Sequence, residues 1–374
     1  MKNRNQGAWP SAVLLLALGS PSVLGATAFG QASQQSLEHL QAGAAHLQHN
    51  EVDQAIRECK AAVAADPQSA PAHMLLGEAY LATGSFSVFA EAVAELRQAL
   101  DIDPKLLWAR FYLARCYMDL GRYDRAQQEL EQGLAEHPDV PHFLSLLGEV
   151  NRKQGHPEKS VELNGKAIEL DPSLTPAHYY RALAYIDLKQ DDLAFAELEK
   201  SVQSKYVAPE MYLTLGMLYA RRGKFAEAED AGKKAIALDP SRSESYLALA
   251  QICNLHGKSD EALAAIRTAL PEGKSFPSSP YYQQLQADLF FEQGRAYQAK
   301  HQTPEAIRSY SRALEFDPSR GKAHQQMAVL FAATGNLAQA RVHASMAEKL
   351  GSPVDAALRQ QIHGGQFEST PHQP

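Results

Sequence analysis

The stretch MYLTLGMLYARRGKFAEAEDAGKKAIALDP, residues 211–240, decides the fold. It holds two segments whose apolar residues have helical spacing, and the short sequence RRGK separates them. Gly223 suits a tight turn, and Pro240 is accepted at the start of a helix but not inside one. The stretch therefore predicts two antiparallel helices that end at a proline turn.

The same arrangement recurs along the chain at a spacing of 34 residues. Pro104, Pro138, Pro172 and Pro240 are separated by 34, 34 and 68 residues. One Gly or Ala recurs in each repeat, and six of the eight spacings are 34: Gly43, Gly77, Ala114, Gly148, Ala182, Gly216, Ala250, Gly294 and Ala328. Small residues at fixed places let two helices pack closely. A period of roughly 20–50 residues is typical of solenoids and other repeat arrays.

These repeats resemble the tetratricopeptide repeat, whose pattern is W-x2-L-G-x2-Y…A-x3-F…P. The closest match lies in the stretch quoted above: Tyr212, Leu215, Gly216, Tyr219, Ala228, Ala235 and Pro240. The resemblance covers about residues 36–351. It implies an all-α fold, a right-handed superhelical solenoid of about nine helix-turn-helix hairpins with a C-terminal capping helix. One hairpin cannot bury its apolar face alone, whereas stacked hairpins share a continuous core.

The chain divides into segments on this basis. We predict a signal peptide at 1–28, repeats one to seven at 36–274, an inserted loop at 271–280, repeats eight and nine at 281–352, a capping helix at 353–363 and a disordered tail at 364–374. Two further small residues in each repeat, beginning with Ala55 and Ala62, support these boundaries. The inserted loop could form a joint between repeats seven and eight.

The first thirty residues have the features of an export signal. Lys2 and Arg4 precede a short apolar core at 12–19, and small residues lead to Gly25 or Ala28 as the cleavage site. This core is far shorter than the ~20 residues that span a bilayer. We therefore expect an exported protein in a bacterial periplasm or cell envelope. The alternative is an uncleaved N-terminus that anchors the protein to the membrane.

Composition and motifs exclude several classes of function. The formal net charge of −7 disfavours nucleic acid and anionic bilayers as partners. The signatures GxSxG, GxxxxGK[ST], GxGxxG and HExxH are missing, so we expect no enzyme and no small-molecule cofactor. Cys59, Cys116 and Cys253 are widely spaced and are expected to pack as small apolar residues; a reactive thiol or a disulfide bridge is the alternative.

Histidine is a common metal ligand, and the chain has fourteen histidines. His39, His73, His178 and His324 occupy the same place in four repeats, near the start of the first helix. Such recurrence indicates packing or capping rather than a shared metal site, so we predict none. His46 and His49 are about one helical turn apart and leave a weak surface site as the alternative.

The resemblance implies that the first helices of the repeats line a concave groove where partners bind. Carried over by position, the groove residues are Trp108, Phe111, Arg115, Met118, Glu149, Arg152, Tyr179, Leu183, Met217, Arg221, Gln251, Asn254, Phe291 and Arg295. Aromatic, Met and Arg side chains are enriched in interface cores. A peptide could place carboxylates on Arg115, Arg152 and Arg221. The alternative for each aromatic residue is packing between adjacent first helices.

We expect a non-enzymatic exported scaffold that binds a protein or peptide in this groove and supports envelope assembly or secretion. Membrane contact, if any, would occur only through an uncleaved signal. The alternative is a periplasmic scaffold that binds or guides an exported polysaccharide past Trp108, Phe111, Tyr179 and Tyr180.

Overall fold

The computed structural model describes residues 34–204, 206–271, 276 and 279–364. This part of the chain contains nineteen α-helices, one short 3-10 helix η1 (Phe86–Val88) and no strand. The predicted all-α fold of packed helical hairpins is therefore confirmed. The expected signal peptide and residues 365–374 of the expected tail lie outside the described residues.

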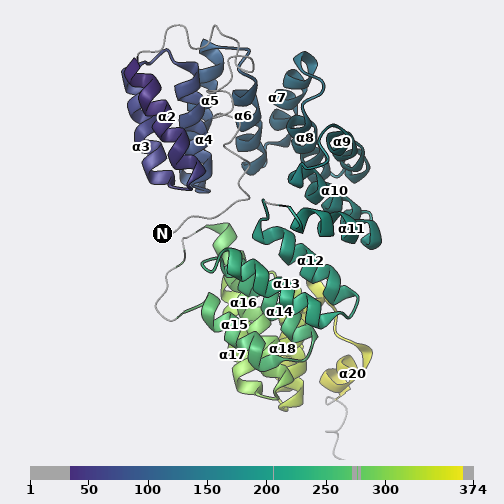
Figure 1. Cartoon of the computed structure of the whole chain (residues 1–374). Coiled ribbons are helices and arrows are strands. Elements are labelled where there is room, and N and C mark those ends of the chain that lie inside the picture. Colours follow the sequence, from purple (N-terminus) through teal and green to yellow (C-terminus); the bar gives the residue numbers. More distant parts are fainter. Residues whose placement is uncertain (1–33, 205, 272–275, 277–278, 365–374) are drawn as a thin grey trace, which may run out of the picture. The chain divides into compact units, whose positions relative to one another are not determined.

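The helices alternate as first and second members of nine hairpins, numbered here in chain order (Figure 1). The first helices are α2 (Gln34–Gln48), α4 (Ala70–Ala82), α6 (Leu107–Asp119), α8 (Pro141–Lys153), α10 (Thr175–Asp187), α12 (Pro209–Arg221), α14 (Ser243–Leu255), α16 (Pro280–Ala299) and α18 (Gly321–Ala333). The second helices are α3 (Val52–Ala65), α5 (Phe89–Ile102), α7 (Tyr123–Glu136), α9 (Pro157–Leu170), α11 (Asp191–Val202), α13 (Phe225–Leu238), α15 (Ser259–Ala269), α17 (Thr303–Phe316) and α19 (Leu337–Lys349). The last helix, α20 (Ala356–Gly364), follows hairpin nine.

The chain forms two compact units, Met1–Leu215 and Gly216–Pro374, which divide within α12. Inside each unit, packing follows chain order: α3 packs on α4 and α5 on α6 in the first unit, and α15 on α16 in the second. The division does not lie at the 271–280 insertion, where the sequence suggested a joint. There, α16 packs directly on α14 and α15.

The recurring small residue marks a place where the two helices of one hairpin are in direct contact. A Cβ added at Gly77 would lie 2.5 Å from Cγ of Leu96, and one at Gly294 would lie 2.6 Å from the Tyr310 ring. At Gly43, it would lie 2.8 Å from Sγ of Cys59. These distances are too short for any side chain, so the repeat pattern records direct contact between helices.

All three cysteines are free and buried, as predicted. Burial is the main reason that the pKa of the Cys59 and Cys116 thiols is raised. Burial also raises the pKa of Cys253 to about 11. The thiolate is the reactive form, so these side chains act as small apolar residues in the core.

The turn inside each hairpin needs a left-handed residue. Gly121 fulfils this role with φ +69°. In hairpin five the glycine is missing, and Lys189 takes the same conformation with φ 60°. A residue with a Cβ is disfavoured there, so this turn is strained.

The last helix covers the end of the array. In α20, Leu358 is 8 % exposed and Ile362 is fully buried. The helix contacts α18 and α19, and Nε of Arg341 in α19 donates to the carbonyl oxygen of Ile362. It thus covers the apolar face that hairpin nine would otherwise expose. No helix of the described residues has the length and apolar character needed to cross a membrane.

Candidate functional site

The first helices of the N-terminal unit lie side by side. α4 contacts α6, α6 contacts α8, and α8 contacts α10. We call this row of four helices the first-helix wall. It carries eight of the predicted groove residues: Trp108, Phe111, Arg115, Met118, Glu149, Arg152, Tyr179 and Leu183.

Arg152 is the centre of a charged cluster on the first-helix wall. Its Nε and Nη2 donate to the two carboxylate oxygens of Glu149 at 2.8 and 2.9 Å. Its Nη1 donates to Oδ2 of Asp187, in the next hairpin, at 2.8 Å. Burial alone would lower the pKa of Arg152, but these carboxylates raise it, so the guanidinium stays charged. Arg152 therefore connects hairpins four and five.

Arg115 lies in a second charged cluster of the wall. Its Nε is 3.7 Å from Oδ2 of Asp119. Burial would lower the pKa of the Arg115 guanidinium, whereas Asp119 and Tyr180 raise it. Burial raises the pKa of the Asp119 carboxyl, although Arg115 and Lys153 oppose that shift. The wall thus holds two arginines, Arg115 and Arg152, each next to a carboxyl group of the same chain.

The aromatic residues of α6 pack mainly against α8. Trp108 meets Phe111 and Phe143 edge to face, with ring centroids 5.4 and 6.2 Å apart. Phe111 is only 2 % exposed, and its ring lies 5.4 Å from that of Phe143. The structure therefore corrects the expectation that Phe111 lines an accessible groove: it packs between two first helices, the alternative that the sequence left open.

Four predicted groove residues of the wall are uncharged and stay partly exposed. Trp108, Met118, Tyr179 and Leu183 are half-buried. The Tyr179 hydroxyl lies 3.4 Å from Oγ1 of Thr214, and burial raises its pKa to about 12. Tyr179 is therefore a neutral hydrogen-bonding group at neutral pH.

The other six predicted groove residues belong to the C-terminal unit. Asn254 donates through Nδ2 to Oε2 of Glu292 at 2.8 Å, and Nη1 of Arg295 lies 3.0 Å from the same oxygen. The Phe291 ring lies 5.5 Å from that of Tyr310. Met217 and Gln251 are half-buried, and Arg221 is exposed. The structure brings together Asn254 and Arg295, which share the carboxylate of Glu292.

The recurring histidines connect the two helices of a hairpin. Nδ1 of His73 and of His178 each lies 2.6 Å from a carboxylate oxygen, of Glu95 and Glu197 respectively. Nε2 of His178 lies 3.0 Å from the carbonyl oxygen of Pro172. Both partner atoms only accept hydrogen bonds, so both ring nitrogens donate when both bonds form. These contacts confirm the packing role predicted for His73 and His178.

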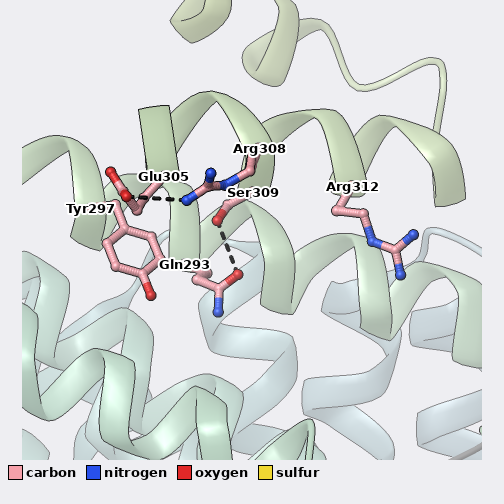
Figure 2. Close-up of a pocket in the computed structure, with 6 residues that line it drawn as sticks. All are labelled: Gln293, Tyr297, Glu305, Arg308, Ser309 and Arg312. Atoms are coloured by element: carbon pink, nitrogen blue, oxygen red, sulfur yellow. Dashed lines mark hydrogen bonds and ion pairs between the residues drawn. The ribbon is translucent and has the colours of Figure 1, made fainter. Parts of the chain in front are cut away.

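The sequence did not single out a small open pocket in hairpin eight (Figure 2). Its volume is about 190 Å³, and six residues of α16 and α17 line it: Gln293, Tyr297, Glu305, Arg308, Ser309 and Arg312. Arg308 pairs with Glu305 at 3.1 Å, and Ser309 donates to Gln293 at 3.0 Å. Arg312 pairs with Glu315 at 2.6 Å. The polar side chains that line the pocket are thus largely bonded to one another or to Glu315.

The His46 and His49 pair that the sequence left open as a weak metal site has contacts of its own in the structure. Among the residues that the structure describes, no group of three or more His, Cys, Asp or Glu side chains is placed to hold a metal ion. His46 bonds Glu51, and Nδ1 of His49, in the turn after α2, lies 2.8 Å from the carbonyl oxygen of Ala45.

Comparison with known proteins agrees with this geometry. Sequence profiles described as tetratricopeptide repeat match residues 40–106, 89–150 and 213–280. A crystal structure of the APC/C hetero-tetramer Cut9-Hcn1 covers 96 % of this chain, and the match covers 82 % of that chain, with a TM-score of 0.61 at 15 % identity. The chain belongs to the tetratricopeptide repeat family, whose members generally serve as protein-binding scaffolds.

Curated relatives are distant. Lipopolysaccharide assembly protein B of Escherichia coli K12 is 23 % identical over 242 residues, which cover 62 % of this chain and 61 % of that protein. The antiviral innate immune response effector IFIT1 of Macaca fascicularis is 24 % identical over 186 residues, 44 % of this chain and 38 % of that protein. The chain thus spans less than two thirds of the length of either relative.

Proposed function

We propose that this chain is a non-enzymatic, exported scaffold that binds a protein or peptide partner on its first-helix wall and supports envelope assembly or secretion. The observation that carries the proposal is the side-by-side packing of α6, α8 and α10. Half-buried Met118, Tyr179 and Leu183 lie on the same three helices as charged groups that intramolecular contacts hold in place. Preformed surfaces of this kind bind with little loss of side-chain entropy.

The charges on the wall refine the kind of contact that a partner would make. Arg152 is already paired with two carboxylates, so a partner gains little from adding a third. The contact energy would come instead from apolar side chains placed on Met118 and Leu183, with the Tyr179 hydroxyl as a hydrogen-bonding group. This favours an extended apolar peptide over a strongly acidic one.

The proposed location rests on two supports. The N-terminal sequence has the charge and small-residue pattern of an export signal. One curated relative is named for lipopolysaccharide assembly in E. coli, a process of the bacterial envelope. An intact-mass measurement of the purified protein would test export, because removal of residues 1–25 or 1–28 predicts two specific masses. Retention of Met1 in the envelope fraction would point to a membrane-anchored form.

The polysaccharide alternative has less support. It requires accessible ring faces, yet Phe111 is 2 % exposed and Trp108 meets His142 and Phe143 edge to face. Tyr179 and Tyr180 remain half-buried. A sugar would thus find fewer stacking surfaces than the sequence suggested.

Affinity capture followed by titration tests the proposal. The mature chain would capture envelope proteins, and each purified candidate would be titrated by calorimetry. Leu183→Ser should weaken a true wall partner at least tenfold, because it removes apolar contact area. Leu193→Ser is the matched control, since Leu193 is 50 % exposed on the second helix α11. Equal loss in both variants, or binding only to polysaccharide in co-sedimentation, would overturn the proposal.

A further inference from the structure

Hairpin nine replaces the His–carboxylate contact of other hairpins with a pair of histidines. His324 of α18 occupies the repeat position of His73 and His178, and its Nδ1 lies 2.8 Å from Nδ1 of His343 in α19. In hairpins one, two and five the partner at this place is Glu58, Glu95 or Glu197. In hairpin nine an imidazole nitrogen of His343 therefore stands where hairpins one, two and five have a carboxylate oxygen.

The hydrogen bonds of His324 determine its tautomer. Its Nε2 lies 3.3 Å from the carbonyl oxygen of Pro318, which can only accept. Nε2 therefore carries the proton, and Nδ1 of neutral His324 presents a lone pair. Because a hydrogen bond between the two Nδ1 atoms needs one donor, a single proton lies between them.

The surroundings orient this pair and disfavour the charged form of His343. Burial, and then the neighbouring His324, lower the pKa of His343. The Phe331 ring stacks on His343 with centroids 5.5 Å apart and an interplanar angle of 24°. In the His73 and His178 contacts the partner is a carboxylate, so each of these places offers one imidazole only. Among hairpins one, two, five and nine, hairpin nine alone places two imidazole nitrogens at one point.

We propose that His324 and His343 form a binding site for a divalent late transition-metal ion such as Cu²⁺ or Zn²⁺, bound through both Nδ1 atoms. Two nitrogens at about 2.0–2.1 Å from one ion lie about 2.9 Å apart when they subtend a right angle, close to the separation here. Binding releases the shared proton to solvent, and a small rotation of each ring directs both lone pairs at the ion. Imidazoles suit these metals, with Cu²⁺ held most tightly.

The second ring nitrogen of His324 strengthens this assignment. Histidine ligands of metal ions commonly donate their other N–H to a carbonyl or carboxylate, which fixes the tautomer and the ring orientation. The bond from Nε2 to Pro318 has this arrangement before any ion is present. With two protein ligands, water completes the coordination, so the affinity is expected in the micromolar range.

Binding at this place would join the two helices that support the C-terminal cap. α20 contacts both α18 and α19, so an ion held between His324 and His343 stabilises the cap as well as hairpin nine. The site is independent of the proposed partner surface, because no residue of the first-helix wall takes part.

Calorimetric titration of the full mature chain with Cu²⁺ tests the site, with His46→Gln and His49→Gln in every protein to remove the competing surface pair. His343→Glu recreates the pair of hairpins one, two and five, so its metal-free Tm should match the parent. We expect the parent to bind one Cu²⁺ at this site, with two nitrogen ligands in the electron paramagnetic resonance spectrum, and His343→Glu to bind at least tenfold more weakly.

A gain-of-site variant provides the reverse test. Glu95→His places a second imidazole opposite His73, whose Nε2 already lies 3.1 Å from the carbonyl oxygen of Pro67. This variant should bind one more Cu²⁺ per chain than the parent.

Two results would overturn the proposal. One is Cu²⁺ binding in His343→Glu that is as tight as in the parent, and the other is a His343→Glu spectrum that still shows both nitrogen ligands. If the metal-free Tm of His343→Glu is lower than that of the parent, the loss of Cu²⁺ could reflect a damaged fold. His324→Gln then provides the second test, because it must also lose the ion.

Discussion

Arg152 and Asp187 join two successive hairpins through a bond of 2.8 Å between Nη1 and Oδ2. Arg152 also holds both oxygens of Glu149, a residue of its own helix that is 4 % exposed. The arginine therefore neutralises a buried carboxylate and fixes the spacing of α8 and α10. A residue that the sequence placed in a binding groove has a structural role in the stack.

Replacing this arginine should destabilise the protein. Arg152→Ala leaves Glu149 buried with only Lys153, 3.9 Å away, as a cationic neighbour. We expect a loss of about 1–3 kcal/mol in the free energy of unfolding, because a buried charged acceptor loses its donors. Denaturant titration measures it. Lys153→Ala, at a side chain 44 % exposed, is the control and should change stability by less than about 0.5 kcal/mol. Equal effects would show that Glu149 does not depend on Arg152.

Two helical glycines should respond to alanine in opposite directions. Gly77→Ala places a Cβ 2.5 Å from Cγ of Leu96, so the hairpin must open, at a cost of about 1–3 kcal/mol. At Gly165 the nearest atom would be Nη1 of Arg181 at 3.7 Å. Gly165→Ala should therefore raise the stability by about 0.5–1 kcal/mol, because alanine favours the helix. Thermal unfolding of both variants compares them, and a stable Gly77→Ala would contradict the close approach.

The turn of hairpin five should be improved by glycine. Lys189 adopts φ 60°, where a Cβ is disfavoured. Lys189→Gly should raise the free energy of unfolding by about 0.5–1 kcal/mol, because relief of strain exceeds the added entropy of the unfolded chain. The reverse change, Gly121→Ala at φ +69°, should lower stability by a similar amount. Chemical denaturation measures both, and a destabilised Lys189→Gly would show that its side chain is needed at this turn.

Acid should remove the stability that Glu197 contributes. Burial would raise the pKa of this carboxyl, but bonds from His178, Arg181 and Lys200 lower it to about 2. Because the folded pKa lies below the unfolded value, the contribution is complete above about pH 4.5 and disappears as the pH falls towards 2. The difference in unfolding free energy between the wild type and Glu197→Gln should be on the order of 2 kcal/mol above about pH 4.5. It should become smaller as the pH falls from there towards 2.

A neighbouring carboxyl provides the control for that experiment. Glu199 lies on the same helix but is exposed. Glu199→Gln should leave the pH dependence of the wild type nearly unchanged. If the advantage of the wild type over Glu197→Gln stayed constant down to pH 2, the bonds at Glu197 would not act through its ionisation.

The helices could be predicted from the sequence because one physical constraint repeats. Each hairpin needs a residue without a large side chain where its helices meet, as Gly77 meets Leu96 and Gly294 meets Tyr310. The constraint is local to each hairpin, so it can be recognised from spacing alone. The division within α12 could not be predicted in this way, because Leu215 and Gly216 follow the same repeat pattern as their equivalents elsewhere.

The candidate site was harder to predict because position on a helix does not determine the partner of a side chain. Phe111 and Met118 lie on the same first helix, yet Phe111 is buried against Phe143 while Met118 stays half-buried. Arg152 was predicted as a binding residue from its position in the repeat, but the carboxylates that pair with it come from two helices. The histidine contacts were better predicted, since recurrence at one repeat position identified their structural role.

The bond to the proline carbonyl has a consequence for how this chain can vary. Nε2 of His178 reaches Pro172, Nη2 of Arg110 reaches Pro104, and the hydroxyl of Tyr246 reaches Pro240, each across six residues. An imidazole, a guanidinium and a phenol thus make the same bond to the proline turn before a first helix. Exchange among His, Arg and Tyr at this repeat position should therefore leave the fold unchanged. The residue that faces this position from the second helix, such as Glu197 or His343, is then free to change its chemistry.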